Sequence, residues 1–347
     1  MRWKPCSKRR SLSKMPAPPK RILIIQLASL GDILQSSGYI TALQRQTGAQ
    51  IGWVVEGRGG ECLVRGNPAV NAVYRISRNP LRLLWMSYLI WRRRYTHAVI
   101  LHRNAWFSRW AKGLGIPERV GFFQRGVVLT RDVDFLAYSS MWERYAAVAT
   151  LITGQPMGVQ RPTFLPTDHF VPPPGKWIAL APFGGRNAYS SMTTKRWPYF
   201  PLLIEAVLAG DPDTQILLVG DSADAREWQQ LGLSGTDRVH NGMGLLSIPA
   251  LAIWLRHCTA LVSNDSLALY LGLSQYTPVI GLFGPTQKTE FLPPIPGAHG
   301  LQAQTFCSPC YHPTAHRHSL AFACPFGVAC MREVQVGDVL DILRNIY

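Results

Sequence analysis

One acidic residue stands at the point where the first predicted strand turns into a helix. The apolar run 22–25 is typical of a buried strand, and the loop "ASLGD" leads from it into a helical pattern over 32–46. In an open parallel sheet such a turn lies at the carboxyl end of a strand, where ligands bind. Asp32 therefore either caps the helix or takes a proton from a bound hydroxyl group. Gly31, beside it, lets the backbone come close to a ligand.

A second loop combines hydroxyl groups with a lysine. The segment 181–200, "APFGGRNAYSSMTTKRWPYF", follows a predicted strand and precedes a helix that starts near Pro198. Hydroxyl groups and backbone amides at a helix start bind phosphate oxygens, and the ammonium group of Lys195 adds a positive charge. The alternative is a solvated polar loop without a ligand. The hydroxyl residues of the loop are Ser190, Ser191, Thr193 and Thr194.

A third loop places polar residues at another strand end. Asn264, Asp265 and Ser266 lie between a predicted strand and a short helix, so a helix N-terminus would face the ligand there. Asp265 or Asn264 could equally serve as a helix cap. Gly284 belongs to a further turn, "FGPT". Neither G-x-G-x-x-G nor the Walker A pattern occurs in these loops, so no NAD, FAD or other cofactor is predicted.

The elements that must position these loops alternate between short apolar runs and helical patterns in both halves of the chain. This alternation predicts an α/β fold with two doubly wound, Rossmann-like parallel-sheet domains facing a central cleft. Strands are predicted near 21–27, 50–55, 72–76, 97–101, 177–183, 215–220, 260–263 and 278–284. Helices are predicted near 32–46, 59–65, 80–93, 141–152, 198, 223–231, 248–257 (capped by Ser247) and 266–272. The predicted organisation is a disordered basic tail (1–20), an N-terminal domain (21–165), a Pro-rich linker (166–176) and a C-terminal domain with a Cys-containing tail (177–347).

The charge is concentrated in the first half of the chain. Residues 1–20 carry seven Lys/Arg and no acid, residues 21–165 carry eighteen basic and seven acidic residues, and residues 166–347 carry eleven and thirteen. Such asymmetry indicates a polyanionic partner: nucleic acid, an anionic membrane surface or a phosphorylated substrate. No nucleic-acid motif is found, so that partner is not expected. The N-terminus lacks the apolar core of a signal peptide, although its composition also fits a transit peptide.

The segment 81–95, "LRLLWMSYLIWRRRY", and the C-terminal cysteines each allow two interpretations. The first is too short to span a bilayer, so it is either a buried helix with a solvated end or a helix lying on a membrane surface.

The cysteines form a C-x2-C-x13-C-x5-C pattern, and their last spacing is unusual for zinc. They therefore either pack structurally or bind a metal; these weak metal candidates are Cys307, Cys310, Cys324 and Cys330.

Taken together, the three loops resemble glycosyltransferase family 9, the ADP-heptose:lipopolysaccharide heptosyltransferases, over about residues 21–345. "RILIIQLASLGDIL" is similar to the opening strand and its S-x-G-D turn, and "GGRNAYSSMTTKRWP" to the donor-phosphate loop. "SNDSLALYLGL…TPVIGLFGPT" is similar to the D-[ST]-G-x-x-H helix and the closing G-P-[ST] turn. The resemblance implies a metal-independent GT-B enzyme with its acceptor on the first domain and ADP-heptose on the second.

The resemblance also assigns roles to residues. Asp32 matches the general base, and Lys195 matches a contact to the donor diphosphate; the two meet only when the cleft closes. Asp224 falls where the family has a glutamate that holds the ribose. The expected donor-binding residues are Ser190, Ser191, Asp224, Asn264, Asp265, Ser266 and Gly284. The expected acceptor-binding residues do not come from the resemblance: they are Gly31, from the first loop, and Arg92, Arg93, Arg94 and Arg103, from the basic first half of the chain.

The implied reaction is inverting transfer of a heptose, or a related sugar, to an anionic lipopolysaccharide inner core or similar glycolipid. It would occur in the cytoplasm, at the cytoplasmic face of the inner membrane, with peripheral binding to that membrane. Two residues depart from the pattern, since Leu267 replaces a glycine and Tyr270 replaces a histidine. They keep open a catalytically impaired homologue that binds sugar nucleotides or glycans. Another GT-B enzyme, such as a sugar-nucleotide epimerase, is a further alternative.

Overall fold

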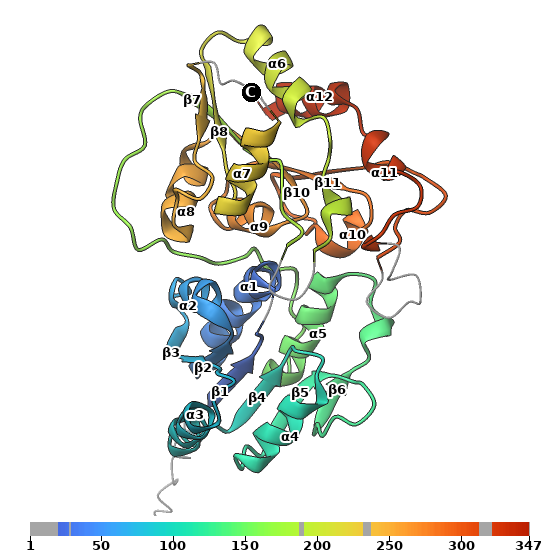
Figure 1. The fold of residues 1–347 in the computed structure, drawn as a ribbon. Coiled ribbons are helices and arrows are strands. Elements are labelled where there is room, and N and C mark those ends of the chain that lie inside the picture. Colours follow the sequence, from blue (N-terminus) through green and yellow to red (C-terminus); the bar gives the residue numbers. More distant parts are fainter. Residues whose placement is uncertain (1–19, 28, 187–190, 232–236, 312–320, 347) are drawn as a thin grey trace, which may run out of the picture.

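The computed structural model describes residues 20–346 apart from 28, 187–190, 232–236 and 312–320. Within these residues the chain forms two α/β domains, one above the other in Figure 1. The N-terminal domain contains a six-stranded parallel sheet with the order β3-β2-β1-β4-β5-β6. Its strands are β1 (Arg21–Ile25), β2 (Gln50–Val55), β3 (Val70–Arg75), β4 (His97–Ile100), β5 (Glu118–Phe122) and β6 (Arg131–Val133).

The helices of this domain cover both faces of its sheet. Apolar side chains of α3 and α4 pack on one face, and those of α1, α2 and α5 pack on the other. The central strand β1 is therefore buried on both sides, which explains its continuous apolar run. The helices are α1 (Leu30–Thr47), α2 (Gly57–Arg65), α3 (Pro80–Arg92), α4 (Ala105–Gly113) and α5 (Met141–Thr153), with a 3-10 turn η1 (Phe135–Ala137).

The C-terminal domain repeats the same topology. Its six parallel strands have the order β12-β11-β10-β7-β8-β9. Read from the β9 edge and numbered from one within the domain, this is the order 3-2-1-4-5-6 of the N-terminal sheet. The strands are β7 (Lys176–Ala181), β8 (Thr214–Leu218), β9 (Val239–Asn241), β10 (Ala260–Asn264), β11 (Val279–Phe283) and β12 (Ala298–Gln302). The helices are η2 (Thr193–Lys195), α6 (Phe200–Gly210), α7 (Ser222–Gln230), α8 (Ile248–His257), α9 (Leu267–Ser274), α10 (Lys288–Phe291), α11 (Ala329–Arg332) and α12 (Val336–Ile346). The predicted fold class, two doubly wound domains, is confirmed.

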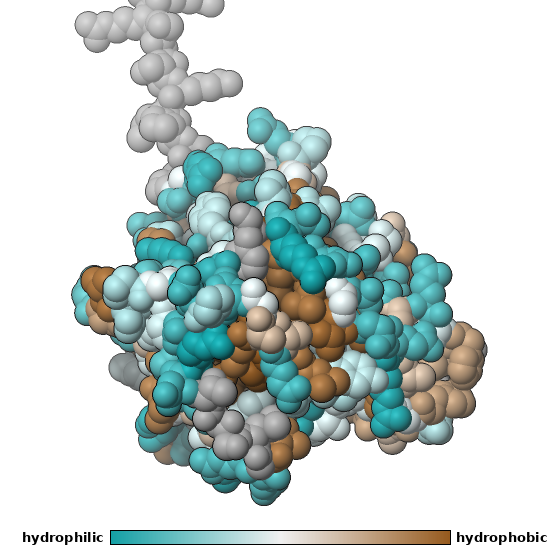
Figure 2. Space-filling view, turned by 90° about the horizontal axis from the view of Figure 1, so that it is seen from above, coloured by the Kyte–Doolittle hydropathy of each residue, from teal (hydrophilic) through white to brown (hydrophobic). Residues whose placement is uncertain are grey.

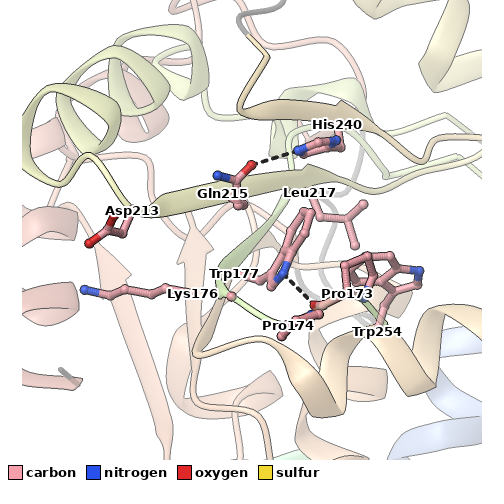
Figure 3. Close-up of a pocket in the computed structure, with 10 residues that line it drawn as sticks. Pro173, Pro174, Lys176, Trp177, Asp213, Gln215, Leu217, His240 and Trp254 are labelled. Atoms are coloured by element: carbon pink, nitrogen blue, oxygen red, sulfur yellow. Dashed lines mark hydrogen bonds between the residues drawn. The ribbon is translucent and has the colours of Figure 1, made fainter. Parts of the chain in front are cut away.

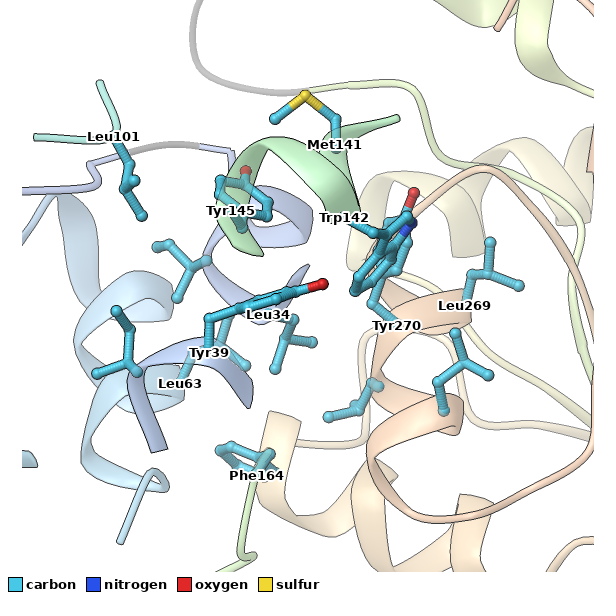
Figure 4. Close-up of a cluster of buried hydrophobic side chains, with 14 of the residues drawn as sticks. Leu34, Tyr39, Leu63, Leu101, Met141, Trp142, Tyr145, Phe164, Leu269 and Tyr270 are labelled. Carbon is cyan, nitrogen blue, oxygen red and sulfur yellow. The ribbon is translucent and has the colours of Figure 1, made fainter. Parts of the chain in front are cut away.

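The two domains share one hydrophobic core where they meet. Tyr39 and Trp142 from the first domain lie near Tyr270 from the second, and the rings of Trp142 and Tyr270 are 6.2 Å apart (Figure 4). The indole of Trp142 donates to the backbone oxygen of Phe291 at 3.0 Å. The buried guanidinium of Arg144 pairs with the buried carboxylate of Glu290, and this contact also joins the domains. The structure therefore shows the domains packed together rather than separated.

The surface is mixed in polarity. Seen from above, hydrophilic residues cover most of the visible face, and hydrophobic residues gather near its middle (Figure 2). None of the helices described is both long enough and apolar enough to cross a bilayer.

Most predicted elements are present within a few residues, but several were missed. The prediction contained no element for α4, β5, β6, β9, α10, β12, α11 or α12. The missed strands β6, β9 and β12 are short or only partly buried, so they lack the apolar run that marks a central strand. The predicted cap Ser247 is confirmed, because its hydroxyl accepts from the amide of Ala250.

Candidate active site

The fold brings the predicted loops to corresponding places in the two domains. In each sheet the strand order reverses at the first strand: between β1 and β4 in one domain, and between β7 and β10 in the other. Such a switch point opens a crevice at the carboxyl ends of the strands, and ligands bind there. Asp32 follows β1, the loop of Lys195 follows β7, and Asp265 follows β10. All three lie close enough to influence one another electrostatically.

Asp32 takes part in capping a helix, and its environment also suits a general base. Ser29 is the N-cap of α1, and Asp32 occupies the third helical position as its partner in a capping box. One carboxylate oxygen of Asp32 accepts from the amide of Ser29 at 2.8 Å and from its hydroxyl at 3.2 Å. Burial raises the pKa of Asp32 above its usual value, against the opposing effects of Ser29 and Lys195. A partly buried carboxylate with a raised pKa suits a general base.

Lys195 forms the positive end of a small polar network. Its ammonium group lies 2.7 Å from one carboxylate oxygen of Asp265, and the hydroxyl of Tyr270 donates to the other oxygen at 2.8 Å. Burial alone would raise the pKa of Asp265, but Lys195 and the hydrogen bonds outweigh this and lower it. The hypothesis that Lys195 and Asp32 meet only on closure stays a prediction. In the structure the charge of Lys195 lowers the pKa of Asp32, against the larger effect of burial.

Tyr270 also packs closely against Gly31. A Cβ atom on Gly31 would lie 3.3 Å from the Tyr270 ring, so the start of α1 touches α9 of the other domain. Where the sequence departs from the family's histidine, Tyr270 supplies a hydrogen-bond donor to Asp265. Leu267 begins α9 and packs against the shared core. Sequence reasoning missed this contact, since nothing local in the sequence pairs position 31 with position 270.

The loop after β7 folds back on itself. Gly185 has a φ of +76°, and a Cβ atom there would lie 2.2 Å from the backbone oxygen of Met192, so only glycine fits. The amide of Met192 donates to the backbone oxygen of Gly185 at 2.6 Å. Ser191 is exposed and forms an isolated bridge with Arg186. Ser190, the other predicted phosphate contact, lies outside the described residues.

Asp224 is held by protein groups at the position expected to bind a ribose. It is the third residue of α7, it accepts from the amide of Asp221 at 2.9 Å, and it pairs with Arg186. Arg186 also donates to Glu227 at 2.8 Å. Burial raises the pKa of Asp224 despite these contacts. Arg186 thus contacts the carboxylate that was predicted to hold the ribose, and sequence reasoning did not identify Arg186.

Two residues that were predicted to contact the donor make structural contacts. Asn264 is buried, and its amide group accepts from the Trp197 amide at 3.0 Å and donates to the Pro182 oxygen at 2.9 Å. Its polar atoms therefore hold the β7 loop rather than face a ligand. Gly284 is required for packing, because a Cβ atom there would lie 2.8 Å from the sulfur of Cys330. Ser266 is only partly buried and is the N-cap residue of α9, so it remains a predicted donor contact.

The predicted acceptor arginines lie at two different places. Arg103 follows β4 at the carboxyl edge of the sheet, and Asp32 is among the charges that influence its pKa, which burial lowers. Arg92, Arg93 and Arg94 precede β4 at the opposite edge, where the backbone oxygen of Arg93 accepts from the side chain of Arg21. The structure therefore brings Arg103 to Asp32 and does not bring the other three there.

Tyr311 lies beside Lys195, and sequence reasoning missed it. Lys195 lies 5.9 Å from the centre of its ring, and its amide donates to the Pro285 oxygen at 2.8 Å. Burial, followed by the charge of Asp32, raises the pKa of Tyr311 to about 12. No motif marked this residue, because it follows the cysteine pair in an irregular segment.

The four cysteines of the C-terminal region are free thiols within electrostatic reach of one another. Burial is the main cause that raises the pKa of Cys330 to about 12, and it also raises the pKa of Cys310. Within the part of the chain that the structure describes, no three His, Cys, Asp or Glu side chains are arranged to hold a metal ion.

A separate pocket of about 630 Å³ lies at the start of β7 and β8 (Figure 3). Its lining includes Trp177, His240 and Trp254, and the side chains of Gln215 and His240 are 2.9 Å apart within it. This pocket is at the amino ends of the strands, so it is distinct from the switch-point crevice. It contains none of the predicted site residues.

Comparisons with known proteins show which proteins the chain is similar to. The family model described as glycosyltransferase family 9 (heptosyltransferase) matches residues 91–320. Lipopolysaccharide heptosyltransferase 2 of Escherichia coli K12 is 26% identical over 233 residues, which cover 58% of this chain and 63% of that protein. The chain thus spans less than two thirds of the curated relative that it matches.

Solved structures show the same fold. The E. coli ADP-heptose LPS heptosyltransferase II has a TM-score of 0.71 at 20% identity and covers 94% of this chain and 98% of its own. The E. coli heptosyltransferase WaaC with ADP has a TM-score of 0.70 at 17% identity, covering 94% of this chain and all 100% of its own. These likenesses confirm the two-domain architecture.

Proposed function

The chain belongs to glycosyltransferase family 9, and on this basis we propose that it transfers a heptose from ADP-heptose to an anionic, lipid-linked saccharide. One observation carries the proposal: Asp32 and the Lys195–Asp265 pair come from opposite domains and lie together at the two switch points. A hydroxyl acceptor and a diphosphate donor need this combination of a base and a positive charge.

The proposed reaction is a single displacement. Asp32 takes the proton of the acceptor hydroxyl as its oxygen bonds to the anomeric carbon, and the bond from that carbon to the donor phosphate oxygen breaks. The nucleoside diphosphate leaves with the bonding electrons. Because there is one displacement and no covalent enzyme intermediate, the anomeric configuration inverts. Lys195 and the N-terminus of α9 would stabilise the charge on the departing diphosphate, and no metal is needed for this role.

The charge of the chain supports an anionic acceptor. Arg103 lies at the cleft near Asp32, and the N-terminal domain is the basic one. Such a field attracts a phosphorylated or carboxylated glycolipid. The proposed site of action is the cytoplasmic side of a membrane that carries this lipid, to which the protein would bind peripherally.

The proposal is tested by incubating the full chain with ADP-heptose and a lipopolysaccharide inner-core acceptor. Mass spectrometry should show the acceptor gaining one heptose, with one ADP released per transfer, and NMR should show inversion. ADP should also raise the melting temperature more than UDP or GDP does. Release of ADP without a sugar-bearing product would refute transfer to this acceptor class.

A second candidate is a homologue that binds sugar nucleotides without transferring the sugar. It is favoured by Leu267, which replaces the family's glycine at the start of α9, where the donor phosphates are expected. In that case ADP-heptose would raise the melting temperature, and no transfer or donor hydrolysis would be detected with any acceptor.

A further inference from the structure

Helix α3 of the N-terminal domain is apolar on two faces. Met86 and Ile90 are buried and pack on the sheet. The outward face is also apolar: Leu81 is 75% exposed, Leu84 66% and Trp85 63%. A helix that is apolar all round normally lies inside a protein or a lipid environment. We define the α3 surface as Leu81, Leu84, Trp85, Tyr88 and Trp91, all of which are exposed.

The aromatic residues of this surface form one row. The ring centres of Trp85 and Tyr88 are 5.5 Å apart, and those of Tyr88 and Trp91 are 6.2 Å apart. Helix α4 extends the row, because the indole of Trp110 donates to the hydroxyl of Ser87 at 3.0 Å. The exposed ring of Trp106 stacks on Trp110 with centres 5.6 Å apart. Tryptophan and tyrosine concentrate where proteins meet the headgroup layer of a bilayer.

The charges around this surface have one sign. Residues 77–115, which include α3 and α4, contain eight Lys/Arg and no Asp or Glu. Arg92 lies over the ring of Tyr88 at 5.8 Å, and Arg94 lies over the ring of Trp91 at 4.8 Å, so cations and rings alternate. Arg21, the first residue of β1, donates to the backbone oxygen of Arg93 at 2.9 Å. The first strand of the domain therefore begins beside this cluster.

We infer that the α3 surface docks on an anionic lipid bilayer, with its apolar side chains among the headgroups and its arginines on lipid phosphates. A second copy of the chain fits less well, because a symmetric contact would place arginines against arginines. Basic residues beside an apolar helical face bind anionic lipid in this manner. In Figure 1 α3 lies on the side of the N-terminal domain away from the C-terminal domain, which leaves the latter free of the membrane.

This inference deepens the proposed function, since a lipid-linked acceptor requires the acceptor domain to stay at a membrane. Only the biological purpose of docking depends on the proposed function, because the α3 surface is present whatever reaction the protein catalyses. Docking through α3 would hold the N-terminal domain where such an acceptor emerges from the lipid. The C-terminal domain would exchange nucleotide sugars with the surrounding solution.

The test is co-sedimentation of the full chain with vesicles of phosphatidylcholine, alone or mixed with phosphatidylglycerol. The protein should bind the anionic vesicles, and raising salt from about 0.1 M to about 0.5 M should weaken this binding by roughly tenfold or more. Leu84→Ser/Trp85→Ser and, separately, Arg92→Gln/Arg94→Gln should each reduce it by roughly tenfold. Matched controls on the C-terminal domain, Leu202→Ser/Leu245→Ser and Arg332→Gln/Arg344→Gln, should bind like the parent chain.

The outcomes separate docking from catalysis. All changed side chains are exposed, so melting temperatures should stay near that of the parent chain. The Leu84→Ser/Trp85→Ser variant should also transfer sugar to a delipidated, water-soluble acceptor at the parental rate. Equal vesicle binding by parent and α3 variants would overturn the inference, as would salt-insensitive binding to neutral lipid. Dimerisation that depends on Trp85, without vesicle binding, would overturn it in favour of self-association. Failure of transfer by every protein, with the vesicle results as expected, would refute the proposed function and leave the docking surface.

Discussion

Replacing Asp32 by asparagine should separate catalysis from folding. The carboxylate of Asp32 accepts hydrogen bonds from the amide and the hydroxyl of Ser29, and asparagine can accept the same two bonds through its amide oxygen. The loss at the start of α1 is then the interaction of the charge with the helix dipole, about 0.3–1 kcal/mol. Relief of the cost of burying the charge acts in the opposite direction. The free energy of unfolding should change by less than about 1 kcal/mol.

The effect on transfer should be far larger. A positioned general base contributes roughly 10²- to 10⁴-fold to rate, and asparagine cannot accept a proton. Asp32→Asn should therefore lower kcat by roughly this factor, while ADP affinity stays within a few-fold because Ser29 is the group that Asp32 contacts. The measurements are ADP release under saturating donor, ADP titration calorimetry and denaturant unfolding on the same protein.

The chain offers a matched control. Glu143 occupies the same third position in the capping box of α5, where it accepts from the amide of Ser140 at 3.1 Å, and it is exposed. Glu143→Gln should change stability by a similar small amount and leave kcat within about twofold. If Asp32→Asn retained the parental turnover, or lost it only in proportion to a large loss of stability, the role of Asp32 as base would be refuted.

The pH dependence supplies an independent check. The base form of Asp32 is required, and burial raises its pKa above the usual 3.8, so kcat/KM should fall as the pH decreases through this raised value. The decrease should have unit slope and should be missing from the residual activity of Asp32→Asn. A limb at the ordinary aspartate value, or one that persists in the variant, would assign the titration to another group.

Other predictions concern the network and the interdomain contact. Lys195→Met should weaken ADP binding by roughly ten- to a hundredfold in calorimetry, and Lys195→Arg should weaken it less. Because Lys195 lowers the pKa of Asp265, this pair stabilises the fold above pH 3.8 and the contribution is lost as pH falls, so Lys195→Met should show a flatter stability profile in acid. Tyr270→Phe removes a donor to a buried carboxylate, so it should lower the free energy of unfolding in denaturant by about 1–3 kcal/mol. Equal stability of this variant and the parent chain would contradict the network. Tyr270→His should retain most of the transfer activity. Glu290→Gln should cost about 3 kcal/mol, measured in the same way, because it leaves the buried charge of Arg144 without its partner.

The sequence predicted the central elements because they are buried on both sides. β1, β7, β10 and β11 are long apolar runs at the middle of their sheets, so their signal is local. β6 has two exposed residues of three and lies at a sheet edge, so no pattern marked it. Helix α4 was missed although its cap Asn104 accepts from the amide of Trp106.

The candidate site was predictable only in its local part. Asp32, Lys195 and Asp265 follow strands, and the switch-point rule places them together once the fold is given. The contacts of Tyr270 with Gly31 and of Arg144 with Glu290 join residues more than a hundred positions apart, so they depend on how the domains pack. The backbone contacts of Asn264 were not predictable, because an amide at a strand end is equally suited to a ligand and to the backbone groups that it binds here.

The pairing of Lys195 with Asp265 explains how a carboxylate with a raised pKa can lie near an ammonium group. Direct contact with an ammonium group would lower the pKa of Asp32 and weaken it as a base. In the structure Lys195 lies 2.7 Å from Asp265, whose charge it balances, while Asp32 is bonded to Ser29 of its own helix. Burial can then keep the pKa of Asp32 raised even though Lys195 is near. In the proposed mechanism Asp265 would therefore separate the two functions: it would fix the ammonium group on the donor side and leave Asp32 free to act on the acceptor.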